Sequence, residues 1–187
     1  TVRGRSADGL GNIRFTSNNY ATLYGGFKHD ASALTIFNEL SGSLKLGTNG
    51  IDRVTIDSSG RITTPYQPAF FAYRNGAAFT ATGPGIFDAT RVNTGTHYNT
   101  SNGRFTAPVS GVYFFTCQGL PNSASGQIYM YLQKNGTRYS ANFYVINPDE
   151  SCSISAVIDL AISDYVEVYY AGGSEQTYCH FSGFLIG

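Results

Sequence analysis

The sequence predicts an all-β protein whose main part is a β-sandwich or jelly roll. The 187 residues include 14 Tyr, 13 Phe and 22 Gly but one Met and no Trp, a balance typical of strands joined by many turns and unfavourable to long helices. Phe105, Val112 and Phe114 alternate with smaller or polar residues around a break at Pro108 and Gly111. This pattern predicts strand, tight turn, strand, and it carries no catalytic signal.

The charge and hydropathy of the chain argue against nucleic acid and membrane partners. Charged residues make up 13% and sum to zero, so no basic stripe for nucleic acid is expected. No apolar run approaches the roughly 18–20 residues of a membrane helix; the best, 156–162, is interrupted by Asp159, so we expect no membrane insertion. The chain starts at Thr1 without an initiator Met, and we expect it to be the last part of a longer protein.

Two prolines close together, Pro65 and Pro68, predict a linker between two regions, 1–64 and 65–187. In the first region each β-like segment offers only two or three apolar side chains. One chain would then bury too little to offset an ordering cost of about 1–2 kcal/mol per residue, so we expect several copies to wind together as a β-rich shaft segment. The segments are Asn12–Thr16, Ala33–Phe37, Ser43–Leu46 and Arg53–Asp57.

The pattern of the second region predicts a dense series of strands separated by turn residues. About nine strands at this spacing predict a sandwich or jelly roll. The expected strands are 68–74, 86–92, 103–106, 111–118, 127–134, 139–146, 152–161, 164–170 and 178–186.

Residues 66–187 resemble the globular head of complement component 1q and its tumour-necrosis-factor-like relatives. The resemblance implies a ten-stranded jelly roll that assembles as a homotrimer and binds partners without catalysis. One departure is visible: the usual Gly-Asp before the penultimate strand is Ser163–Asp164 here, where Asp164 keeps the turn-forming side chain. The matching segments are 68–72, 87–88, 92–93, 98–115, 131–136 and 181–186.

The first region resembles the shaft segments of bacteriophage tail fibres, through the residues 52–61, and no collagen-type Gly-x-y run precedes the head. Joined to a trimeric head, a trimeric shaft would share one threefold axis. The leading hypothesis is therefore a virion protein: a phage tail fibre, connected at its N-terminus to the rest of the fibre or tail. Its head would adhere non-covalently to a glycan or protein receptor on the host surface.

Three other functions stay open. The first is a secreted, extracellular complement- or cytokine-like ligand for a protein receptor, which glycosylation at the sequons Asn99–Ser101 or Asn135–Thr137 would favour. The second is a cap that holds the trimer together and binds nothing else. The third, a glycan depolymerase, would need two carboxylates across a groove.

The chemistry-bearing residues indicate no enzyme and no cofactor. His29, His97 and His180 lack the spacing of a metal site, and no Gly-x-Ser-x-Gly elbow or phosphate-binding glycine loop is present. Calcium would suit the loop carboxylates Asp149 and Glu150, although a solvated turn is the favoured interpretation.

Three cysteines, Cys117, Cys152 and Cys179, have no Cys-x-x-Cys spacing. They are either free, buried thiols or, outside a reducing cytoplasm, a Cys152–Cys179 bridge with one thiol left over.

The expected binding residues lie in loops. If the last strand ends at the base of the head, three loops fall at the tip, 119–126, 146–151 and 171–177, and the turns 134–137 and 162–164 fall at the base. A trimer would repeat each tip loop three times, so weak contacts would gain from multivalency. The predicted binding residues are Asn122, Ser123, Ser125, Asn147, Asp149, Glu150, Ser174, Glu175 and Gln176.

Overall fold

The computed structural model describes residues 2–3, 11–16, 23–29, 32–76, 82–121, 128–140, 143–145, 151–171 and 176–187. All regular structure in these residues is β-strand, which confirms the predicted fold class. The chain divides into two compact units, Thr1–Pro65 and Tyr66–Gly187. No helix in the described parts is long and apolar enough to cross a membrane.

The first unit contains two small antiparallel sheets. Strands β1 to β4 pair in chain order, and β5, β6 and β7 form a second sheet of two hairpins. Several apolar side chains stay in water, with Leu34 65%, Leu46 57% and Ile62 67% exposed. The strands are β1 Val2–Arg3, β2 Gly11–Thr16, β3 Leu23–His29, β4 Leu34–Asn38, β5 Leu44–Thr48, β6 Ile51–Ile56 and β7 Ile62–Thr63.

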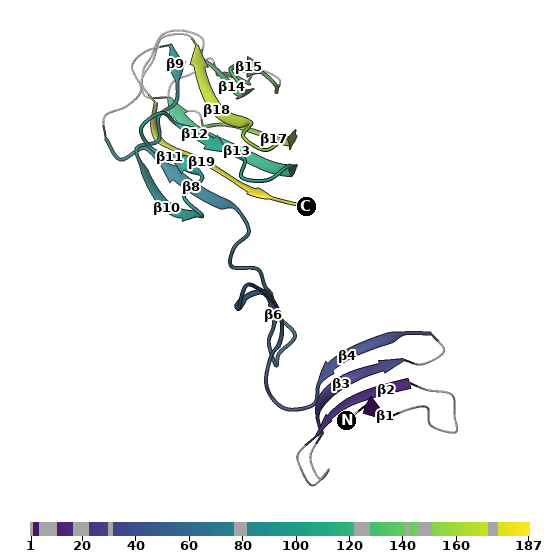
Figure 1. The fold of residues 1–187 in the computed structure, drawn as a ribbon. Coiled ribbons are helices and arrows are strands. Elements are labelled where there is room, and N and C mark those ends of the chain that lie inside the picture. The colour runs from purple at the N-terminus through teal and green to yellow at the C-terminus, as the bar shows by residue number, and fades with distance from the viewer. Residues whose placement is uncertain are drawn as a thin grey trace. The chain divides into compact units, whose positions relative to one another are not determined.

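The second unit, the head, is a sandwich of two antiparallel sheets (Figure 1). One sheet has the order β10-β8-β19-β13-β17, and the other has the order β11-β12-β18-β14-β15, with β16 beside β14 and β9 beside β18. The strands are β8 Ala69–Tyr73, β9 Gly83–Pro84, β10 Ala89–Thr94, β11 Tyr98–Asn99, β12 Arg104–Thr106, β13 Gly111–Pro121, β14 Ile128–Lys134, β15 Thr137–Arg138, β16 Phe143–Val145, β17 Cys152–Leu160, β18 Tyr165–Ala171 and β19 Gln176–Leu185.

The predicted strands of the head match these elements closely, except at two places. The segment 86–92 begins as a strand only at Ala89, because Phe87 turns into the core and exchanges backbone hydrogen bonds with the Tyr98 hydroxyl at 3.3 Å. The segment 139–146 is divided between β15 and β16. There the Leu132 N–H donates to the Ser140 hydroxyl at 3.1 Å, so a side chain takes the place of a ladder carbonyl.

An aromatic cluster fills the space between the sheets. Phe70 stacks on Tyr98 at 4.9 Å and on Phe105 at 5.1 Å between ring centroids, and meets Phe181 edge-on. Phe115 is fully buried among the same rings. Aromatic pairs in these geometries add to the free energy gained from burial alone, by about 0.5–1.5 kcal/mol each.

The three cysteines are free and buried in the same core. The Cys117 thiol lies 3.7 Å from the Tyr170 hydroxyl, and the Cys152 thiol donates to the Gly119 carbonyl at 3.4 Å. Burial raises the pKa of Cys179 to about 12. Of the two alternatives left open by the sequence, the structure therefore holds unreactive thiols rather than a bridge.

The turn before β18 explains why Ser163 can replace the expected glycine. Ser163 adopts a φ of 72°, in the left-handed region that glycine occupies without a steric cost. Asp164 holds the turn: it accepts hydrogen bonds from Asn135 at 2.7 Å, Lys134 at 2.9 Å and the Ala161 N–H at 2.9 Å. These bonds, Asn135 first, lower the pKa of Asp164 to about 2.

We expect Ser163→Gly to stabilise the head by about 0.5–1 kcal/mol, because the strain of a Cβ in the left-handed region outweighs the extra freedom of glycine in the unfolded chain. Urea unfolding followed by circular dichroism measures the effect. The matched control is Ser153→Gly, within the extended strand β17, where the same change should cost about 0.5–1 kcal/mol. Equal changes in the free energy of unfolding at the two positions would show that the backbone of Ser163 is not strained.

Candidate functional site

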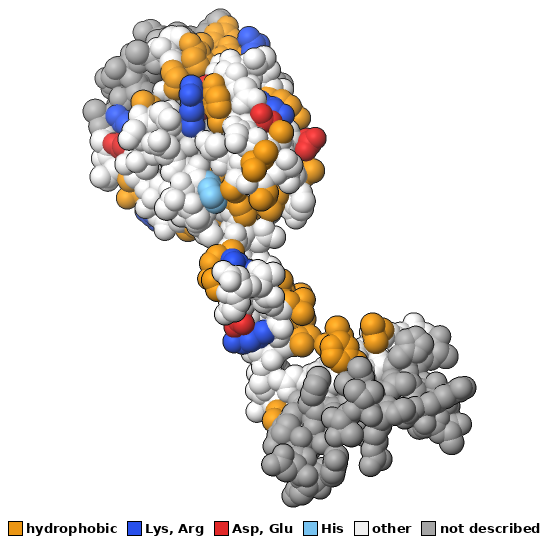
Figure 2. Space-filling model, viewed as in Figure 1, with side chains coloured by type: hydrophobic (Ala, Val, Ile, Leu, Met, Phe, Trp, Pro, Cys, Tyr) orange, Lys and Arg blue, Asp and Glu red, His pale blue; other side chains and the backbone are white. Residues whose placement is uncertain are grey.

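The outer face of the five-stranded sheet is apolar across its centre. The strand register places Ala69, Phe184, Phe114 and Val157 side by side on four neighbouring strands. Phe184 is 49% exposed and Val157 is 56% exposed. We call this surface the apolar face; its large apolar members are Phe71, Val92, Val112, Phe114, Val157, Phe184 and Ile186. Figure 2 shows one side of the head, on which hydrophobic side chains gather in patches with charged side chains beside them.

One end of the apolar face carries polar groups. The His180 ring stacks on Phe71 with 5.0 Å between ring centroids and 18° between planes. Its partners in the strand register are Tyr73 and Gln118, and the Arg91 guanidinium lies 5.3 Å from the centre of the Tyr73 ring. Burial lowers the pKa of His180, because partial loss of water disfavours the imidazolium.

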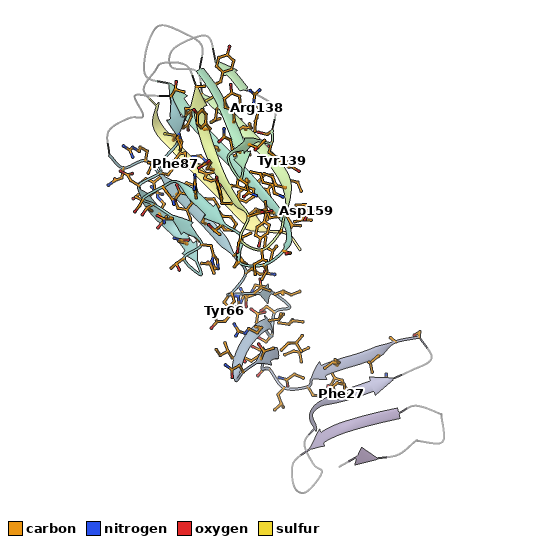
Figure 3. All side chains as sticks on the ribbon, turned by 45° about the horizontal axis from the view of Figure 1, so that its top comes forward. Phe27, Tyr66, Phe87, Arg138, Tyr139 and Asp159 are labelled. Atoms are coloured by element: carbon orange, nitrogen blue, oxygen red, sulfur yellow. The ribbon has the colours of Figure 1, made fainter. Side chains whose placement is uncertain are left out.

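The outer face of the seven-stranded sheet is chemically different. Glu167 is only 3% exposed although it points away from the core; the Arg104 Nε donates to its Oε2 at 2.9 Å. This hydrogen bond raises the pKa of Arg104, whose guanidinium also lies 4.0 Å from the centre of the Tyr165 ring. Arg138, labelled in Figure 3, lies 4.5 Å from the centre of the Tyr131 ring in the same way.

The predicted tip loops begin and end at one end of the sandwich. The register pairs Pro121 with Gln176, Gly119 with Cys152, and Tyr129 with Ala171, so the strand ends that flank the three loops lie together. The opposite end is where the Leu185 N–H donates to the Pro68 carbonyl at 3.0 Å.

Eight of the nine predicted binding residues lie outside the described residues: Asn122, Ser123, Ser125, Asn147, Asp149, Glu150, Ser174 and Glu175. The ninth, Gln176, begins β19 and pairs with Pro121. The nine residues therefore stay a prediction. The Asp149–Glu150 pair falls among the eight, and within the described parts of the chain no group of three or more His, Cys, Asp or Glu side chains could hold a metal ion.

The sequence analysis did not predict the outer face of either sheet, although the alternation of residues in β13 indicated one of them. In β13 the residues Tyr113, Phe115 and Cys117 are fully buried, so Val112 and Phe114 point outward. An aromatic or branched residue at both parities of one strand marks a sheet that is covered on both faces. The sequence around Glu167 does not indicate that this side chain is buried, because residues on neighbouring strands bury it.

A family model described as C1q domain matches residues 69–186. Complement C1q tumor necrosis factor-related protein 3 from Homo sapiens is 36% identical over 107 residues, which cover 54% of this chain and 44% of that protein. Caprin-2 from Danio rerio is 36% identical over 131 residues, or 66% of this chain and 14% of that protein. The chain thus spans less than half the length of these curated relatives.

A solved structure shows the same fold. The globular domain of zebrafish complement 1qA protein matches with a TM-score of 0.56 and 24% identity, over 65% of this chain and 98% of that domain. At this identity the likeness concerns the fold, and it agrees with the predicted jelly roll.

These comparisons correct the predicted function. Three of the relatives are animal proteins named for complement C1q and tumor necrosis factor, so the predicted phage tail-fibre protein with host attachment as its role is wrong. The virion as its location has no support. The evidence for it was the segment 52–61, which the structure resolves into part of β6 and the turn at Asp57–Gly60. A strand followed by a turn that begins with Asp and ends with Gly occurs in many short hairpins. Such a segment therefore carries little information about a protein family.

We expect Arg104→Ala to destabilise the head by about 1–3 kcal/mol, because it leaves the buried Glu167 carboxylate without its cation. Chemical denaturation at pH 7 measures the change. In the double variant Arg104→Ala with Glu167→Gln the charge is gone as well, so part of the loss should be regained. Identical stabilities of the single and the double variant would show that the pair is not coupled.

Proposed function

Because the chain belongs to the C1q domain family, we propose that its head is the binding module of a secreted, trimeric, complement- or cytokine-like protein. It recognises a protein receptor by non-covalent contacts and performs no catalysis, in keeping with a family of ligand and structural proteins. The observation that carries the proposal is the apolar face, which a single head leaves in water.

Assembly into a trimer would explain why a single head has an exposed apolar face. Trimers are characteristic of this family, and large exposed apolar patches mark interaction sites. Of the two outer faces, one carries Phe114, Val157 and Phe184, while the other carries Arg104 and Glu167. Burial of apolar surface gains about 25 cal/mol per Å², whereas burial of charged groups costs free energy unless they are paired. The apolar face is therefore the one that neighbouring heads cover.

Recognition is assigned to the end of the sandwich where the three predicted tip loops begin and end. Threefold symmetry would present each loop three times, and a receptor with several contact points would gain affinity from simultaneous binding. The nine predicted binding residues are part of this proposal. The strands beneath them provide a rigid scaffold, since β13 pairs along most of its length with both β17 and β19.

Residues 1–65 are proposed to form a trimeric β shaft. Leu34, Leu46 and Ile62 are each more than half exposed in one chain, and strands this short bury little by themselves. Further copies wound around the same axis would cover these side chains. This part of the proposal does not depend on the source of the protein.

The second candidate function is a cap that holds the trimer together and binds no receptor. It uses the same apolar face and makes no use of the tip loops. Binding of the labelled trimer to animal cell surfaces separates the two: saturable binding supports the ligand, and its absence at micromolar concentration supports the cap.

We expect the protein to be a trimer at micromolar concentration and near-neutral pH, and the variant Phe114→Ser with Phe184→Ser to be a folded monomer. Sedimentation velocity gives the mass, and circular dichroism checks the fold. The control is Tyr139→Ser, which changes another aromatic side chain of the head that is 49% exposed but lies beyond the apolar face. A monomeric wild-type protein would overturn the assembly argument.

Secretion through an animal cell should place a glycan on Asn99 and leave Asn135 bare. Both asparagines are exposed. The Asn99 side-chain oxygen accepts from the Ser101 N–H at 2.8 Å, a bond that does not use the NH2 group to which a glycan attaches. The Asn135 NH2 group donates to Asp164 at 2.7 Å, and its oxygen accepts from the Tyr165 N–H at 2.9 Å. A glycan at Asn135 would break the turn that these bonds hold. Mass spectrometry before and after enzymatic deglycosylation tests this, with Asn99→Gln as the control. A glycan on Asn135 in folded protein would contradict the prediction.

A further inference from the structure

The imidazole of His180 lies at one end of the apolar face. His180 belongs to β19, the middle strand of the sheet, and it points to the same side as Ser182 and Phe184. Its ring stacks on Phe71 at 5.0 Å. It is therefore partly withdrawn from water even before a neighbouring head covers the face.

Among the described residues, the groups around His180 do not favour a positive charge. On β8 the neighbouring outward groups are the Phe71 and Tyr73 rings, and on β10 the charged group is Arg91, itself a cation. On β13 the neighbour is the neutral Gln118. The outward carboxylate of β17 is Asp159.

Asp159 is too far away to offset a charge on His180. It pairs with Val112 on β13, whereas His180 pairs with Gln118 on the same strand. Six residues of extended chain separate these two rows, which corresponds to roughly 20 Å at about 3.3 Å per residue. The Debye length at physiological ionic strength is about 8 Å, so the interaction across this distance is weak.

Covering the face would make protonation of His180 more costly. A charge in an interface needs a partner or water, and the described groups on the neighbouring strands supply a cation, rings and an amide. The pKa of His180 already lies below its ordinary value in the single head because of burial. Because covering lowers the pKa of His180 further, the separated head binds a proton more readily than the trimer does. The trimer is therefore favoured above the ordinary histidine pKa of about 6.5 and loses stability as the pH falls below that value.

We propose that His180 makes the assembly of the head sensitive to acid: the trimer holds at neutral pH and separates into folded heads between about pH 6.5 and 5 as the imidazoles become charged. The inference rests on the proposed function, because it requires that neighbouring heads cover the apolar face. A trimer contains three copies of His180. If each must take up a proton on separation, the association constant falls by up to about 1,000-fold per pH unit.

The test uses the whole chain, with sedimentation velocity at pH 7.5, 6.5, 5.5 and 5.0. The wild-type protein should be trimeric at pH 7.5 and monomeric at pH 5.0, and should reassemble when the pH is raised. His180→Gln should stay trimeric throughout this range. Near-UV circular dichroism should show that the heads remain folded.

His97 provides a matched control. Burial lowers its pKa also, and its ring meets the core residue Phe105 edge-on at 6.4 Å. It lies in the turn before β11, outside the apolar face. His97→Gln should therefore separate in acid like the wild type. If Gln at position 180 prevents assembly at pH 7.5, His180→Phe keeps a ring against Phe71 and takes its place.

The outcomes distinguish this inference from the function on which it rests. A wild-type monomer at pH 7.5 would remove the proposed assembly and the inference with it. A wild-type trimer at pH 5.0 would overturn the inference alone, and so would acid separation of both position-180 variants. Loss of near-UV signal together with separation would show acid unfolding, which also overturns it.

Discussion

The alternation of the central strand β13 organises the head. Tyr113, Phe115 and Cys117 are fully buried between the two sheets, while Val112, Phe114 and Thr116 occupy the opposite side of the same strand. β13 lies between β17 and β19 in the sheet, and a shift of one residue would exchange its two faces. The aromatic core therefore specifies the register, and the register decides which side chains remain outside.

The two outer faces follow from this arrangement, and they differ in chemistry. One has a row of apolar side chains across four strands, and the other has a buried carboxylate bonded to an arginine with tyrosine rings around it. A buried Glu167 is tolerated because Arg104 reaches it at 2.9 Å, and a buried charge without a partner would cost several kcal/mol. The apolar face has no comparable pairing among the described residues, and the proposed trimer would cover it.

The segment that carries the family resemblance is a core and turn signature, and none of the nine predicted binding residues lies in it. Residues 103–116 supply Phe105 and Tyr113 to the interior and place Phe114 on the apolar face. The C1q domain model matches residues 69–186, a range that includes this segment. Short surface segments such as 52–61 are less informative, since few physical constraints act on them. That difference explains why the similarity of the head held while the tail-fibre interpretation failed.

The sequence by itself determined the all-β class, most strands of the head and the turns that join them, because alternation and turn residues are local properties. It also led to the jelly roll through the ordered motifs of residues 68–186. Only the tertiary structure decided that Phe114 and His180 share one face, that Glu167 is buried, and that the three cysteines remain thiols. Each of these depends on which strands are neighbours, and strand pairing joins residues far apart in the chain. Gln118 and His180 are such a pair.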